Sequence, residues 1–210
     1  MYYDFIQTNK RRIIIAIWIL FISVIAWAVW IYVSRIGKLP LVVSTVPSNA
    51  SVSIGGQNYG NGTQWLLPGS YAVKVEKDGF SPRQETIIVS VKKDQNVLAV
   101  SLDPQSNTAK QWVSEHQSDY MNNEQYGSIQ ANTDGKYFTD LNPITTKLPY
   151  TDPYFTIGYS ANNDQTVTLN VTTPSPRYRF YAVEKIRSLG YDPTNFKIEF
   201  KDFHSPLGQK

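Results

Sequence analysis

The chain has 210 residues, of which 41% are hydrophobic, and it contains no cysteine. The missing cysteine excludes a disulfide framework, thiolate metal sites, cysteine nucleophiles and lipid attachment at a cysteine. The formal net charge is +3, but Lys10, Arg11 and Arg12 outweigh Asp4 by two charges and leave only +1 for the rest of the chain, so nothing in the composition indicates a nucleic-acid partner.

The first part of the chain has the pattern of a membrane anchor. Between Ile13 and Ser34 lie 22 residues without a charged side chain, IIIAIWILFISVIAWAVWIYVS. A helix of this length reaches about 33 Å, which matches a hydrocarbon core of about 30 Å. The run is apolar on all sides, which makes a buried core helix the weaker interpretation. We therefore predict an arm over residues 1–12 and a transmembrane helix over residues 13–34 that binds the lipid bilayer.

The charges that flank this run set the expected orientation. Three basic residues precede it and two, Arg35 and Lys38, follow it, so the positive-inside rule favours a cytoplasmic N-terminus by three to two. The expected location is the plasma membrane, single-pass, with the C-terminal domains outside. A cleaved signal peptide is the alternative, because Ala26-Trp27-Ala28 has the small-x-small form, but hydrophobicity continues to Val33 and favours an anchor.

Residues 39–102 read as short strands separated by turn residues. In Tyr71-Ala72-Val73-Lys74-Val75-Glu76 the side chains of Tyr71, Val73 and Val75 share one face of the expected strand. From Val97 to Leu102 the odd-numbered residues likewise oppose the even-numbered ones. Several such strands at close spacing are typical of a small antiparallel β-sandwich.

Three segments of this region carry a family resemblance. They are Val46-Pro47-Ser48-Asn49-Ala50-Ser51-Val52-Ser53-Ile54-Gly55-Gly56, Leu67-Pro68-Gly69-Ser70-Tyr71-Ala72-Val73-Lys74-Val75 and Lys77-Asp78-Gly79-Phe80. They resemble the PEGA domain, a β-sandwich common on bacterial and archaeal envelope proteins. The family's Pro-Glu-Gly-Ala appears as Pro47-Ser48-Asn49-Ala50 and its Asp-Gly turn as Gly55-Gly56, and both changes suit turns, because asparagine tolerates the left-handed backbone conformation and Gly-Gly is a favoured turn pair. The resemblance implies attachment or display at a surface, with no catalytic residues to carry over.

Residues 103–149 are rich in Asn, Gln, Ser and Thr, and this composition predicts a polar linker. One helix is expected within it, over about residues 108–126, because Trp112, His116 and Tyr120 recur every four residues and Thr108 can cap its start. The apolar stripe is narrow, so we expect this helix to lean on a neighbouring domain and consider it as further cover for the C-terminal sheet.

Residues 150–204 predict a small α+β domain with the order β-β-α-β. Phe155, Ile157 and Tyr159 alternate with polar residues, Asn162-Asn163-Asp164 turns the chain, and a second strand follows. Ser175-Pro176 starts a helix that runs to Leu189, and a last strand contains Phe196, Ile198 and Phe200. The overall class is therefore mainly β with α+β content.

The sequence offers little for catalysis or metal binding. His116 and His204 are the only histidines and lie in regions of unrelated pattern, and the chain has neither a phosphate-binding glycine motif nor a nucleophile elbow. We therefore expect no enzymatic activity, no metal and no cofactor.

The C-terminal domain has more aromatic and basic residues than one covered sheet face can hide. Exposed aromatic side chains often mark binding surfaces. The candidates for binding are Tyr154 on the first strand and Arg177, Tyr178 and Tyr181 on the helix.

The preferred interpretation is a non-enzymatic membrane-anchored cell-surface protein. The sandwich would serve as a spacer or attachment module, and the C-terminal domain would contact a partner, either an envelope protein or a surface polymer. A subunit of an envelope-spanning assembly, such as a pilus or secretion apparatus, is the alternative, and an envelope enzyme ranks last.

Overall fold

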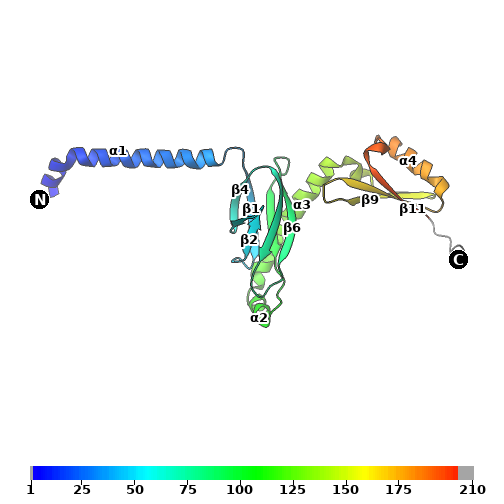
Figure 1. Cartoon of the computed structure of the whole chain (residues 1–210), viewed down its shortest axis with the longest axis horizontal. Helices are drawn as coiled ribbons and strands as arrows, with labels where there is room; N and C mark the ends of the chain where they lie inside the picture. The colour runs from blue at the N-terminus through cyan, green and yellow to red at the C-terminus, as the bar shows by residue number, and fades with distance from the viewer. Residues whose placement is uncertain (1, 203–210) are drawn as a thin grey trace. The chain divides into compact units, whose positions relative to one another are not determined.

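The computed structural model describes the backbone of residues 2–202 and the side chains of residues 11 and 14–201. The chain forms two compact units, which divide between Gln130 and Ala131 (Figure 1). The expected class is confirmed: an apolar N-terminal helix is followed by sheets with substantial strand content and further helices.

Helix α1 (Tyr2–Ser34) contains the expected apolar segment. Among the described residues it is the one helix long and apolar enough to cross a membrane, over Ile14–Ser34, and the protein buries none of that segment. The helix begins well before the apolar run, since it includes residues 2–12 of the predicted arm.

Two sheets follow α1 and pack as a sandwich. The first sheet has the order β4-β1-β7 and the second the order β3-β2-β5-β6. The strands are β1 (Leu39–Val46), β2 (Ser51–Ile54), β3 (Gln57–Tyr59), β4 (Gly62–Leu66), β5 (Gly69–Glu76), β6 (Arg83–Val89) and β7 (Asn96–Ser101). Their inward side chains, among them Leu41, Val52, Val75 and Leu98, form one core because period-two alternation sends every second residue inward.

Two details of the sandwich differ from the expectation. It is not wholly antiparallel, because β1 and β7 pair in parallel, with Leu41 opposite Asn96 and Val46 opposite Ser101. Gly55 and Gly56 both have positive φ, as a primed hairpin turn requires, but Asn49 does not adopt the expected left-handed conformation, since Gln165 is the one described non-glycine residue with positive φ.

The expected polar linker is instead mostly helical, and the single helix over residues 108–126 is two helices. Helix α2 (Asn107–Glu115) begins after Ser106, whose hydroxyl accepts a hydrogen bond from the Ala109 N–H. Helix α3 (Gln117–Leu141) follows after His116. The predicted contact with a neighbouring domain is correct, because Ala109, Trp112 and Val113 pack against the sandwich core. The expectation that this helix covers the C-terminal sheet is wrong, because α2 covers the sandwich instead.

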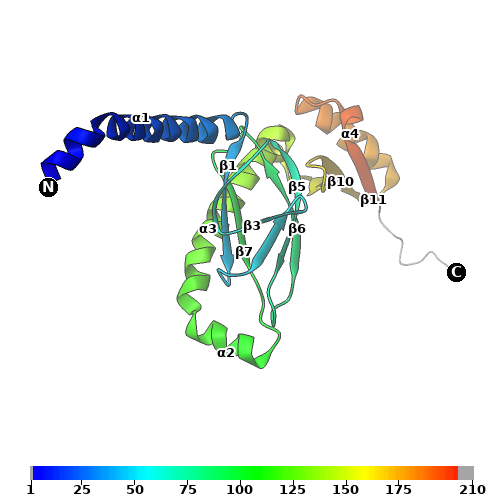
Figure 2. The same cartoon turned by 60° about the vertical axis from the view of Figure 1, so that its left-hand side comes forward.

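The first half of α3 runs beside the free edge of β7 (Figure 2). The Gln130 side-chain oxygen accepts a hydrogen bond from the Ala99 N–H, the Asn123 amide donates to the Ser101 hydroxyl, and the Tyr120 hydroxyl donates to the Leu102 carbonyl. An open strand edge needs hydrogen-bond partners, so a helix that covers such an edge needs polar side chains. This need explains why the sequence of α3 resembles a linker.

The second unit has a four-stranded sheet of order β11-β10-β9-β8, in which β10 and β11 are parallel and the other neighbours antiparallel. Its elements are the 3-10 turn η1 (Pro143–Lys147), β8 (Tyr150–Asp152), β9 (Phe155–Ala161), β10 (Val167–Thr173), the 3-10 turn η2 (Pro176–Tyr178), α4 (Arg179–Ser188), the 3-10 turn η3 (Pro193–Asn195) and β11 (Lys197–Asp202). The order β-β-α-β is present, but strand β8 precedes it and was not predicted. Three residues between two prolines are too short for a periodic signal.

Helix α4 covers one face of this sheet through Ala182 and Ile186, which are fully buried against the strands (Figure 1). Ile144 is equally buried in this core, so the domain starts before the expected boundary at Tyr150. Tyr159 follows the alternation of Phe155 and Ile157, but unlike them it is 41% exposed and stacks on Phe138.

Candidate functional site

The candidate site lies on the second unit, where the β8–β9 hairpin meets the start of α4. Asp152 pairs with Phe155 across the hairpin, so only Pro153 and Tyr154 form its loop. The Asp152 carboxylate accepts a hydrogen bond of 3.1 Å from the Tyr154 N–H, which is the local bond by which aspartate fixes a turn. Tyr154 thus stands at the tip of a short, braced hairpin and is 54% exposed.

The hairpin forms one side of the candidate site, and the residues at the start of α4 form the other. Pro176 begins η2, a position where its fixed φ and missing N–H cost nothing, and the turn ends at Tyr178. Tyr178 stacks on Tyr154 with ring centroids 4.9 Å apart and an interplanar angle of 26°. Tyr181, in the first turn of α4, lies 6.4 Å from Tyr178 and is 58% exposed. Three tyrosines from two separate chain segments therefore form one continuous aromatic surface.

Arg177 supplies the positive charge of this surface. Its guanidinium carbon lies 4.8 Å from the centre of the Tyr178 ring, and an Nη atom donates a hydrogen bond of 2.9 Å to the Tyr178 hydroxyl. A cation held over an aromatic face has a restricted orientation, yet most of its donors remain available to a ligand.

The four residues proposed from the sequence line one open groove of about 660 Å³, together with Asp152 and Phe155. A volume between about 300 and 1,000 Å³ is typical of ligand sites. The structure therefore brings the proposed residues together, while their role in binding stays a prediction.

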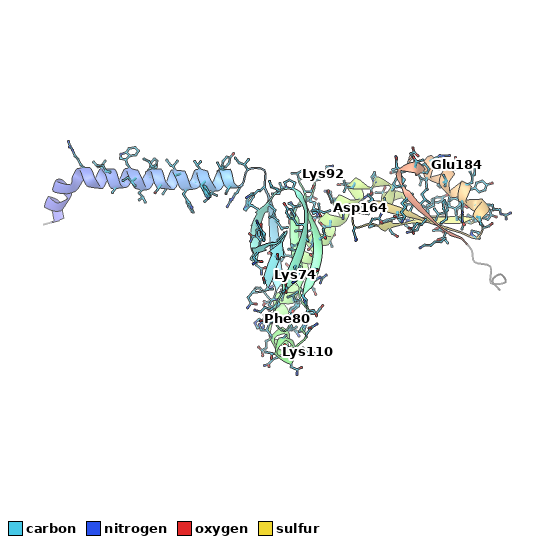
Figure 3. All side chains as sticks on the ribbon, viewed as in Figure 1. Lys74, Phe80, Lys92, Lys110, Asp164 and Glu184 are labelled. Atoms are coloured by element: carbon cyan, nitrogen blue, oxygen red, sulfur yellow. The ribbon has the colours of Figure 1, made fainter. Side chains whose placement is uncertain are left out.

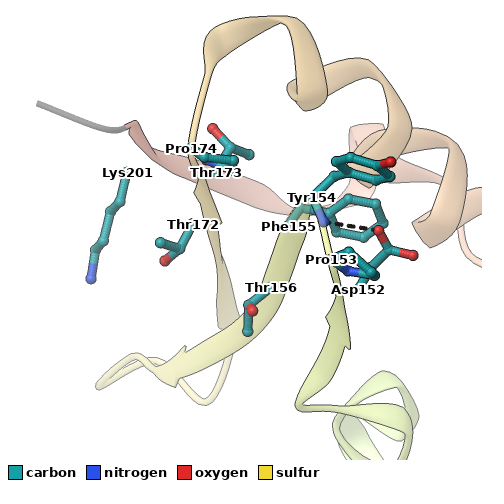
Figure 4. A pocket seen from close by; sticks show the side chains of 9 residues that line it. All are labelled: Asp152, Pro153, Tyr154, Phe155, Thr156, Thr172, Thr173, Pro174 and Lys201. Atoms are coloured by element: carbon teal, nitrogen blue, oxygen red, sulfur yellow. Dashed lines mark hydrogen bonds between the residues drawn. The ribbon is translucent and has the colours of Figure 1, made fainter. Parts of the chain in front are cut away.

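A second groove of about 470 Å³ shares Asp152, Tyr154 and Phe155 with the first (Figure 4). It is lined by Thr172 and Thr173 at the end of β10, by Pro174 just after the strand and by Lys201 from β11, along with the hairpin residues 152–156. Sequence reasoning missed this part, because Thr172 and Lys201 lie far apart in the chain and only the parallel pairing of β10 with β11 makes them neighbours. Their hydroxyl and ammonium groups add hydrogen-bond donors to the aromatic surface.

The chemistry of these grooves suits recognition. They present tyrosine rings, threonine hydroxyls, one arginine, one lysine and the Asp152 carboxylate. No group of three His, Cys, Asp or Glu side chains able to hold a metal is found within the described residues. His116 serves packing, since its ring stacks on Trp112 at 4.1 Å and its Nδ1 lies 2.8 Å from the Trp112 carbonyl oxygen. His204 lies outside the described residues.

Comparison with known proteins supports the first unit's assignment. Residues 39–105 match the PEGA domain family, as the resemblance implied. No curated protein matches the chain. Together with the apolar helix α1, the match fits a membrane-anchored or surface protein.

Proposed function

We propose that this chain is a non-enzymatic, single-pass membrane protein that holds its second unit outside the cytoplasm for contact with a partner. The observation that carries the proposal is the aromatic surface of Tyr154, Tyr178 and Tyr181 beside Arg177. Rigid aromatic side chains and arginine supply most of the binding energy at protein interfaces, because they bury large areas at little entropic cost. The PEGA sandwich serves as the spacer between this surface and the anchor.

The partner we favour is an extended segment of another envelope protein. An open groove lined by stacked tyrosines suits the flat faces and fixed backbone of an extended or proline-rich peptide. A surface polysaccharide is the other outcome of the test, since sugar rings also stack on exposed tyrosine.

Site-specific photo-crosslinking in intact cells tests this function. The photoreactive residue p-benzoylphenylalanine replaces Tyr154 in one variant and Tyr126, a tyrosine of α3 that is 41% exposed, in a control. We expect a crosslinked band of defined mass from position 154 and none from position 126. A band from both positions, or from neither while carbohydrate is recovered with the protein, would contradict a protein partner at this groove.

The orientation has its own test. Lys10, Arg11 and Arg12 before the uncharged segment favour a cytoplasmic N-terminus. Protease added to spheroplasts should therefore remove an epitope fused after Lys210, and cleavage only after permeabilisation would invert the topology. Cleavage of a signal peptide after Ala28 would shorten the mature chain by 28 residues, which intact-mass measurement detects.

A further inference from the structure

The sandwich has one end that differs from the rest of its surface. Within residues 39–105, all of which the structure describes, two large apolar side chains are exposed, Leu67 at 55% and Val91 at 73%. Strand register places both at the end where β1 begins, because Leu39 pairs with Leu66 and Gly69 pairs with Val89. This anchor end consists of residues 35–38, 66–69 and 90–95.

Charge gathers at the same end. Arg35, Lys38, Lys92 and Lys93 belong to it, against one acidic residue, Asp94. Figure 3 shows Lys92 at this end of the sandwich and Phe80 and Lys110 at the opposite end. Apolar side chains beside lysine and arginine are the composition that favours a layer of anionic lipid headgroups.

The connection to α1 keeps this end close to the membrane. Four residues, 35–38, separate the last residue of α1 from the first of β1, so even a fully extended connection from Ser34 to Leu39 spans at most about 18 Å. They form hydrogen-bonded turns, in which the Ile36 N–H donates to the Val33 carbonyl and the Lys38 N–H to the Arg35 carbonyl. The Arg35 guanidinium lies 4.7 Å from the centre of the Trp65 ring, which ties the junction to β4.

The two exposed loops are held in shape. The Tyr71 hydroxyl donates a hydrogen bond to the Leu67 carbonyl, and the side-chain oxygen of buried Asn96 accepts one from the Ser90 N–H. A loop whose backbone is already braced loses less conformational entropy when it binds than a mobile loop does.

We infer that the anchor end of the PEGA sandwich rests on the lipid surface beside its own transmembrane helix, with Leu67 and Val91 inserted among the headgroups. The occupant is the bilayer that holds α1, so the inference rests on the anchor part of the proposed function. The sandwich then contacts the membrane surface directly and has a restricted orientation, so it is not a freely tumbling spacer.

The test uses the full chain in nanodiscs of phosphatidylglycerol and phosphatidylcholine. Because the chain has no cysteine, single nitroxide labels are attached at Leu67→Cys, Val91→Cys, Asp78→Cys at the opposite end of the sandwich, and Ser23→Cys within α1. Collisions with oxygen, which concentrates in lipid, and with a water-soluble nickel chelate report the depth of each label. We expect lipid depth at residue 23, headgroup depth at residues 67 and 91, and full nickel accessibility at residue 78.

The outcomes are distinguishable. Lipid depth at residue 23 with full nickel accessibility at residues 67 and 91 would overturn the inference and leave the anchor intact. Nickel accessibility at residue 23 would overturn the anchor and the inference together.

A charge variant gives an independent readout. Lys92→Glu should raise the nickel accessibility of the label at residue 91 at least about twofold in anionic nanodiscs and leave it unchanged in pure phosphatidylcholine. Lys110→Glu, an equal charge change at the opposite end, should have no effect in either lipid. Equal responses to the two variants would overturn a direct contact of the anchor end with anionic lipid.

Discussion

The hydroxyl of Tyr120 in α3 donates a 2.8 Å hydrogen bond to the carbonyl oxygen of Leu102, the residue that follows β7. This bond lies in the row by which α3 covers the free edge of the strand, beside those of Asn123 and Gln130. The edge of β7 is therefore closed to a further strand, and β-strand pairing with another chain would have to use a different edge.

Tyr120→Phe removes this hydrogen bond and keeps the ring. We expect the free energy of unfolding to fall by about 1 kcal/mol, because the partly buried Leu102 carbonyl loses its partner. Urea unfolding followed by far-ultraviolet circular dichroism measures the change. Tyr126→Phe on the same helix is the control and should stay within about 0.5 kcal/mol of wild type. Equal losses in both variants would show that the edge bond contributes nothing specific.

The pH dependence of stability follows from the same residue. Burial raises the pKa of Tyr120 above its ordinary value of 10.0, and the negative charge of Asp103 raises it further. The folded protein then keeps the phenol proton at a pH where the unfolded chain has lost it, so this contribution is fully present below about pH 10 and is lost as the pH rises through the folded pKa.

We therefore expect the stability advantage of wild type over Tyr120→Phe to be constant between pH 7 and about pH 9 and to shrink above about pH 10. Urea unfolding at each pH measures it. Asp103→Asn should weaken the alkaline loss, because it removes one cause of the raised pKa. A constant difference across the whole range would contradict the assignment to Tyr120.

Gly79 supports the start of α2. Its φ is +82°, and its carbonyl accepts hydrogen bonds from the N–H groups of Gln105 and Ser106. An added Cβ would lie 2.6 Å from the Ser106 hydroxyl, so that serine would have to rotate away from the Ala109 N–H that it caps. Gly79→Ala should therefore combine backbone strain with loss of the cap and cost about 2–3 kcal/mol.

Gly56→Ala is the matched control for this substitution. Gly56 has nearly the same φ, +83°, but nothing lies within 4 Å of an added Cβ. We expect it to cost only the backbone strain, about 1–2 kcal/mol. Thermal unfolding compares the two variants, and an equal effect would show that the Ser106 cap does not depend on Gly79.

Gln165 offers a stabilising substitution. It has φ of +67° at the end of the β9–β10 turn, where its N–H donates to the Asn162 carbonyl and the Asn162 N–H donates to the Thr166 carbonyl. Gln165→Gly should raise the free energy of unfolding of the second unit by about 0.5–1 kcal/mol, because glycine adopts this conformation without the steric cost. Asn163→Gly in the same turn lacks that strain and should be neutral or destabilising. Urea titration distinguishes the two, and stabilisation by both would contradict the explanation.

If the first unit anchors the chain and the second unit binds the partner, removing the second unit has a predictable effect. A chain that ends after Gln130 keeps α1, the sandwich, α2 and the part of α3 that covers β7. We expect it to stay membrane-bound and folded, and to lose co-purification of the partner that position 154 crosslinks in the full chain. Val75→Asp in the full chain buries a charge in the sandwich core and should unfold the sandwich. Full partner binding by the truncated chain would locate the binding surface in the first unit.

Much of the architecture could be read from local patterns. An uncharged run of membrane length, period-two strands such as Tyr71–Glu76 and the Gly55-Gly56 turn each carry their signal within a few neighbouring residues, because the physical cause is local. The aromatic and basic candidates on the second unit were found in the same way, from a surplus over what one buried face can hold.

Tertiary structure alone decided the rest. The helix α3 looked like a linker, because Asn123 and Gln130 reveal their purpose only beside the β7 backbone groups that they hydrogen-bond. The parallel pairings of β1 with β7 and β10 with β11 join segments more than 20 residues apart, and the second of them brings Lys201 to the candidate groove. The antiparallel pairing of β5 with β6 brings Val91 to the anchor end. Local propensity cannot determine such contacts, because their free energy comes from burial and hydrogen bonds between segments that the sequence does not place together.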